Sequence, residues 1–114
     1  MIDYTRTKIL PKQRQALCAL LHTLGYDAGM DGLYWLPVPP EDLSPLQREH
    51  LATCGPYALA VEVEKDRLSM EFLVRARNTL CCDCIHPASP QVAAHMQASL
   101  EALLACAGIS PDHS

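Results

Sequence analysis

The chain has 114 residues, 49% of them hydrophobic, and a formal net charge of −4. This length suits a single domain over residues 1–114, and the apolar fraction excludes an intrinsically disordered protein. The acidic balance argues against nucleic acid as a partner, because phosphate binding needs clustered lysine and arginine.

We expect a cytoplasmic protein that binds no membrane. The N-terminal residues lack the apolar stretch of a secretory signal peptide, and no apolar run reaches the ~18 residues of a membrane span. Thiols stay reduced in the cytoplasm. The six cysteines are therefore expected as free thiols or metal ligands rather than as disulfides.

The first predicted element is a helix over residues 11–24. Pro11 suits the first helical turn, and Gly25 suits the left-handed residue just past the end. Leucines follow the i, i+3, i+4, i+7 spacing of one buried helical face: Leu17, Leu20, Leu21 and Leu24.

A short strand is predicted over residues 33–38, and Pro37 confines it to an edge of the sheet. Its candidate contacts with a partner protein are Tyr34, Trp35 and Leu36. A tryptophan in a short, proline-flanked strand can anchor an interface. The alternative is that Trp35 covers the core.

A second helix is predicted over residues 45–54. Ser44 as the N-cap and Gln47 at the third helical position form a capping box. Gly55 and the proline after it end the helix. His50 and Cys54 lie four residues apart and therefore share a helical face.

The strongest strand pattern is a hairpin over residues 57–75, in which apolar side chains alternate with others. A turn about Lys65 and Asp66 places the apolar side chains on one buried face and pairs Glu64 with Arg67 on the other. The expected apolar pairs are Val63 with Leu68, Val61 with Met70, Leu59 with Phe72 and Tyr57 with Val74.

Residues 80–85 are predicted as a third strand of this meander. A helix from Ser89 to about Ala107 and a loose tail over residues 109–114 follow. The expected order is α-β-α-β-β-β-α, which predicts an α+β fold. Its antiparallel sheet contains the hairpin, the third strand and the strand over 33–38, with the N- and C-terminal helices packed on one face. The apolar stripe of the last helix is Val92, Met96, Leu100, Leu103 and Leu104.

The segment TLCCDCIHP, residues 79–87, holds three of the six cysteines and a histidine. One interpretation is a zinc site. Cys81 and Cys84 form a CxxC pair that can bind one tetrahedral ion. Alternatively, Cys82, Cys84 and His86 share one face of an extended strand.

A zinc site built on this segment needs further ligands. His50 and Cys54 could supply them from their shared helical face. The sequence has no second CxxC or HxxxH pair, which structural zinc sites usually contain. In a second interpretation the cysteines are small apolar side chains that fill a strand.

A thiol-redox role is the third interpretation. A two-residue loop at Asn78 and Thr79 would put Cys82 opposite Arg75, and a nearby guanidinium lowers the pKa of a thiol. The hypothesis is a low-pKa thiol at Cys82 or Cys84. A thioredoxin-like site is not indicated, because the next helix begins only after Pro87.

No motif indicates an enzyme. Glu62, Glu64 and Glu71 alternate along the hairpin as they do on a solvated face rather than in a catalytic pair. The sequence contains no glycine-rich phosphate loop, no G-x-S-x-G and no H-E-x-x-H. We therefore assign no catalytic residue.

Two stretches resemble a known family. LCALLHTLGYDAGMDGLYWLPV is similar to the opening helix and first strand of type III secretion chaperones, and YALAVEVEKDRLSMEFLVRAR is similar to their central hairpin. The resemblance implies a homodimer that keeps an extended effector segment unfolded through β-addition and apolar grooves. It implies no catalytic residues.

The leading expectation is a small cytoplasmic, non-enzymatic and chaperone-like protein-binding module without a cofactor. It would capture a segment of another protein at a sheet edge or apolar groove, as a homodimer. The alternative is a metal-binding or thiol-redox protein that uses residues 81–86, with zinc as the cofactor.

Overall fold

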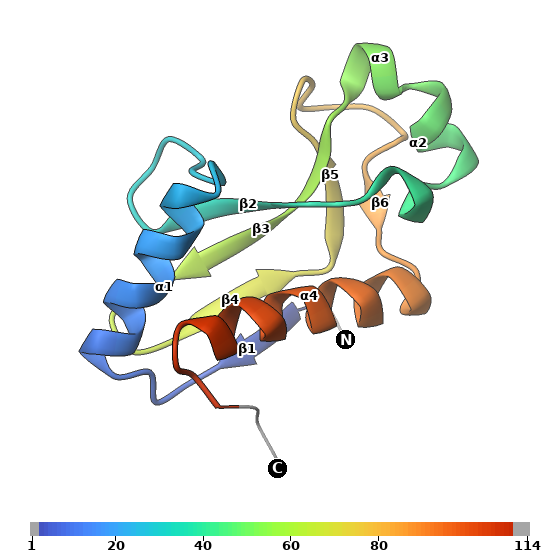
Figure 1. Ribbon diagram of the computed structural model, residues 1–114. Helices are drawn as coiled ribbons and strands as arrows, with labels where there is room; N and C mark the ends of the chain where they lie inside the picture. Colours follow the sequence, from blue (N-terminus) through green and yellow to red (C-terminus); the bar gives the residue numbers. More distant parts are fainter. Residues whose placement is uncertain (1–2, 111–114) are drawn as a thin grey trace.

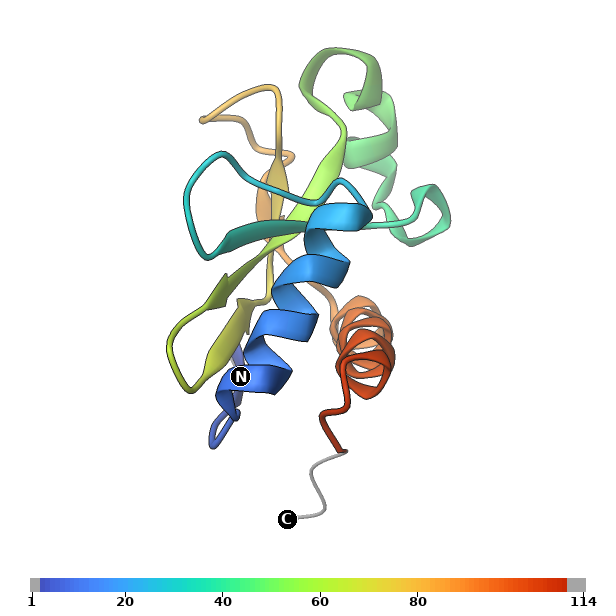
Figure 2. The ribbon, with the colours of Figure 1, turned by 60° about the vertical axis from the view of Figure 1, so that its left-hand side comes forward.

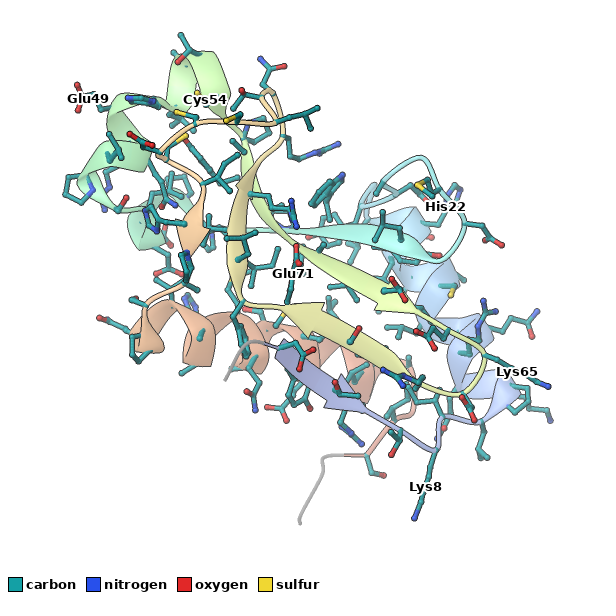
Figure 3. All side chains as sticks on the ribbon, turned by 180° about the vertical axis from the view of Figure 1, so that it is seen from behind. Lys8, His22, Glu49, Cys54, Lys65 and Glu71 are labelled. Carbon is teal, nitrogen blue, oxygen red and sulfur yellow. The ribbon has the colours of Figure 1, made fainter. Side chains whose placement is uncertain are left out.

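The computed structural model describes residues 3–110 and has the predicted α+β architecture. Within these residues, an antiparallel sheet of six strands carries helices α1 (Pro11–Thr23) and α4 (Pro90–Cys106). Figures 1 and 2 show both helices on the same face of the sheet, as the sequence predicts. The opposite face faces the viewer in Figure 3.

The remaining elements are short. The strands are β1 (Asp3–Arg6), β2 (Leu33–Pro37), β3 (Tyr57–Val63), β4 (Leu68–Glu71), β5 (Leu73–Ala76) and β6 (His86–Pro87). The other helices are η1 (Pro40–Asp42), α2 (Pro45–Glu49) and α3 (Leu51–Cys54). In the described part of the chain, no helix combines the length and the apolar character that a membrane crossing requires.

β3 lies at the centre of the sheet. It pairs with β2 on one side and with β4 and β5 on the other. β1 and β6 then pair with the outer edges of β4 and β5 respectively. Because β4 and β5 are separated by Phe72 alone, they form one bent strand along the sheet.

The hairpin register is confirmed near the turn and shifted farther away. Val61 pairs with Met70, and the predicted Glu64–Arg67 ion pair is present at 3.6 Å. Tyr57, however, pairs with Ala76 instead of Val74. The strand β4–β5 thus contains two residues more than β3 at its bend. Because side chains alternate with period two, the buried face keeps its apolar residues.

The core lies between the sheet and the two long helices. On α1 the stripe is narrower than predicted, since Leu17 and Leu21 are buried while Leu24 is 44% exposed. Leu24 is the C-cap residue, where the chain turns away from the sheet at Gly25, whose φ is +79°. The stripe of α4 is confirmed, with Met96, Leu100 and Leu104 fully buried.

Two local predictions are wrong, and one strand is missed. Residues 80–85 form an irregular loop instead of a third strand, and only His86 and Pro87 pair with β5. The helix over 45–54 is interrupted at His50. β1 was not predicted, because of its four residues only Tyr4 is buried and so short a segment has little periodicity.

The predicted loose tail over residues 109–114 begins later than expected. Ile109 is 4% exposed and belongs to the core. Ser110 is held as well, because its carbonyl oxygen accepts a hydrogen bond from Arg6 Nη2 at 2.6 Å. Residues 111–114 lie outside the described part.

Candidate metal centre

His50 and Cys54 lie one helical turn apart. Although α2 ends before His50, the backbone hydrogen bonds continue through it: its N–H donates to Leu46 at 3.1 Å, and its carbonyl accepts from the Cys54 N–H at 2.7 Å. Both side chains therefore project from the same face of one helical segment. Their spacing in the sequence predicts this placement.

The loop between β5 and β6 is fastened to this helical segment at both ends. At one end, the Asn78 N–H donates to the Cys54 carbonyl at 3.0 Å. At the other, Gln47 Nε2 donates to the Cys84 carbonyl at 3.0 Å. Between them a tight turn forms, in which the Ile85 N–H donates to the Cys82 carbonyl at 3.0 Å. The turn directs Cys82 and Cys84 toward α3.

These two segments bring four metal-ligating side chains together. One ligand atom from each of His50, Cys54, Cys82 and Cys84 lies within 4.8 Å of the others. His50 Nδ1 is 3.3 Å from the Cys82 sulfur and 3.9 Å from the Cys54 sulfur. In Figure 3, sulfur atoms gather beside the labelled Cys54, between the helical turns and the loop after β5.

The spacing of this His/Cys cluster suits a tetrahedral ion. Zinc–sulfur bonds of about 2.3 Å in a tetrahedron separate the sulfurs by about 3.8 Å. The largest separation of 4.8 Å in the cluster exceeds that value by only about 1 Å. A contraction of about 1 Å between the ligand atoms would bring them to the spacing of a tetrahedral site.

The thiols of the cluster differ in environment. Burial raises the pKa of Cys84, which is 0% exposed, to about 11. The pKa of Cys82 is lowered to about 7, first because the backbone N–H of Cys84 hydrogen-bonds its thiolate, and then through the Cys84 and His50 side chains. Arg75, the predicted cause, instead pairs with Glu71.

Cys81 and His86, the other two predicted ligands, lie outside the cluster. The Cys81 side chain is exposed near the apex of the loop, beside the fully exposed Leu80. His86 Nε2 is 3.1 Å from Ser44 Oγ, at the start of α2. Neither the CxxC pair nor the strand face of Cys82, Cys84 and His86 therefore forms, because the segment turns instead of running straight.

Of the three predicted partner contacts, only Trp35 lies on the open face of the sheet. Tyr34 and Leu36 alternate to the other face and are buried in the core. The Trp35 ring is half-buried, and the guanidinium carbon of Arg77 lies 5.8 Å from its centroid. A partner could therefore contact Trp35 on this face but not its two neighbours.

Gln47 contributes to the site in a way that the sequence does not indicate. Its Oε1 accepts from the Ser44 N–H, which completes the predicted capping box. The same side chain is 1% exposed and donates to Cys84. The spacing from Ser44 predicts the first bond, whereas the second depends on a loop 37 residues farther along the chain.

Replacing Gln47 with alanine should destabilise the fold by about 2–4 kcal/mol, because the Ser44 N–H and the buried Cys84 carbonyl both lose a partner. Urea unfolding measures the change. Gln13→Ala is the matched control, since Gln13 also accepts from an N-cap N–H and donates to a distant carbonyl, but at an exposed site. Equal losses in the two variants would mean that Gln47 acts only as a cap.

Comparisons with protein-family models, curated proteins and solved structures found no match to this chain. The protein is therefore classified by its fold and its candidate site alone. It is a small α+β protein with a His/Cys cluster between a helical segment and a loop.

Proposed function

We propose that the protein binds one zinc ion through His50, Cys54, Cys82 and Cys84. The observation that carries this proposal is the convergence of four ligand atoms within 4.8 Å from two segments far apart in the sequence. Thiolates and imidazole are ligands that zinc prefers in proteins. Three cysteines with one histidine form a known ligand set of structural zinc sites.

The role of the ion is structural. Four protein ligands fill a tetrahedron and leave no position open for a water or a substrate, as a catalytic zinc requires. The ion would link residues 50–54 to residues 82–84 and so hold the loop after β5 against α3. This role agrees with the expectation of a non-enzymatic protein.

Metal titration tests the proposal. Purified protein, stripped with a chelator and then given zinc, should bind one ion per chain in native mass spectrometry. Cobalt in place of zinc should give the intense visible bands of a tetrahedral thiolate site. A chain that stays bare at equimolar zinc contradicts the proposal. The same spectrum reports whether the protein is the homodimer that the chaperone resemblance implies.

Thiol labelling distinguishes the zinc proposal from the redox hypothesis. Metal-bound thiolates should react slowly with a chromogenic disulfide until a chelator removes the ion. Rapid labelling of Cys82 in zinc-loaded protein would instead favour a thiol-redox function.

A second candidate function, the capture of another protein, is favoured by an apolar groove of about 650 Å³. It lies beside the bend at Phe72, between Asp3, the first residue of β1, and Pro87, the last residue of β6, and residues of α4 line it as well. Phe72, Leu73 and Ala94 are among its apolar lining residues. We propose that it binds an extended apolar segment of another protein, because apolar residues of the sheet and of α4 line it.

Peptide selection tests the groove. A random peptide library displayed on phage should yield apolar sequences, and their binding should be lost in Ala94→Trp. Ala94 is exposed on α4, so tryptophan there fills the groove without entering the core. Peptides that bind Ala94→Trp as well as the unchanged protein would exclude this groove as the binding site.

A further inference from the structure

Tyr57 is a buried tyrosine whose hydroxyl has no hydrogen-bond partner among the described residues. Its side chain is 2% exposed. Its hydroxyl oxygen is buried and makes no hydrogen bond within residues 3–110. Buried hydroxyls in folded proteins nearly always have a partner, so an unpaired one calls for a specific explanation.

The hydroxyl lies beside the His/Cys cluster. Tyr57 opens β3, three residues after Cys54, and its backbone is fixed by pairing with Ala76 and by the Val38 N–H, which donates to its carbonyl at 3.0 Å. Burial is the main cause that raises the pKa of the Tyr57 phenol, followed by the nearby Cys84 side chain and then by Cys54 and Cys82. The phenol is thus held with its hydroxyl toward the thiols.

A metal ion would create the missing acceptor. A neutral thiol is a weak hydrogen-bond acceptor, whereas a metal-bound thiolate is anionic and accepts strongly. Because Cys84 is 0% exposed, water does not reach its sulfur. A donor from the protein is then needed to offset the charge of three thiolates on one divalent ion.

We propose that the Tyr57 hydroxyl donates a hydrogen bond to the Cys84 thiolate in the metal-loaded protein, which makes Tyr57 a positioning residue of the metal site. This inference rests on the proposed zinc function. Groups that donate hydrogen bonds to metal ligands orient those ligands and tune the ion. Removal of such a donor weakens metal binding by about 10–100-fold. Tyr57 and the Cys84 N–H that bonds Cys82 would be two such donors.

Tyr57→Phe tests the inference, because it removes one oxygen atom and keeps the ring. Zinc affinity, measured by competition with a chromophoric chelator, should fall about tenfold or more. The thiolate-to-cobalt charge-transfer band should move to lower energy, since the unbonded sulfur releases electrons more easily. Without metal, the variant should unfold at the same or a higher urea concentration, because an unpaired hydroxyl is gone.

Tyr34→Phe is the matched control. Tyr34 is also buried, but it lies beside Cys18 on the other side of the core, so its variant should keep both the affinity and the band. If Tyr57→Phe binds cobalt with unchanged affinity and an unchanged band, the inference is overturned while the zinc site stands. If the unchanged protein binds no cobalt or zinc, the proposed function fails and this inference fails with it.

Discussion

Replacing Cys84 with serine should lower the affinity for zinc about 100-fold or more. Structural zinc sites bind with about 10–16 kcal/mol in total, which is roughly 3 kcal/mol for each of four ligands. Each 1.4 kcal/mol is a factor of about ten in affinity. A serine hydroxyl is nearly the same size as a thiol, but it does not ionise at neutral pH and cannot replace the thiolate. Competition with a chromophoric chelator measures the loss.

Cys81→Ser is the matched control for this prediction. It makes the same chemical change three residues away, at an exposed side chain outside the His/Cys cluster. We expect its zinc affinity to equal that of the unchanged protein. If Cys81→Ser loses as much affinity as Cys84→Ser, the ligands are the CxxC pair, and the loop must rearrange when it binds metal. Circular dichroism of both variants in chelator checks that each one folds.

The long helices and the central strands are predictable because each buries one face, and the apolar residues of that face recur at the period of the helix or strand. Leucines at helical spacing predict α1, and the alternation in residues 57–64 predicts β3. The side-chain faces at the turn between β3 and β4 are predictable too, since a slip of one residue would move Leu68 and Met70 to the face opposite Val61 and Val63. The two-residue shift at Phe72 leaves no trace in the pattern, because it preserves the alternation.

The conformation of the cysteine segment, residues 80–85, is harder to predict from the sequence. Over the six residues 80–85, alternation does not distinguish a strand from a turn, since both can leave every second side chain buried. The turn forms because Gln47 and Asn78 fasten the ends of the loop to the helical segment. Those contacts join residues 24 and 37 positions apart, a separation at which local propensity carries no information.

The helical half of the site is predictable from sequence, whereas the half formed by the loop is not. The i, i+4 spacing of His50 and Cys54 indicates a shared face, and this depends only on local helical geometry. Whether Cys81 or Cys82 turns toward that face depends on the exact shape of the loop. The placement of the Tyr57 hydroxyl near the thiols likewise depends on how β3 lies against the loop, and a tyrosine at a strand start has no distinguishing pattern.

Removal of zinc should lower the unfolding temperature by about 15 °C, which is the second large effect that we expect. A ligand at 1,000 times its dissociation constant stabilises the folded state by about 4 kcal/mol. For a domain of this size, 1 kcal/mol corresponds to about 4 °C. Calorimetry of the protein with excess zinc and then with a chelator measures the difference.

The pattern across variants and ions tests whether this stabilisation comes from the His/Cys cluster. Cys84→Ser should unfold at nearly the same temperature with and without zinc, whereas Cys81→Ser should keep the full shift. Magnesium should give no shift in any of the proteins, because it prefers oxygen ligands and octahedral geometry. A zinc shift that survives Cys84→Ser would place the ion elsewhere on the chain. Since the proposed ion would join residues 50–54 to residues 82–84, its removal should also expose the loop after β5 to proteolysis well below the unfolding temperature.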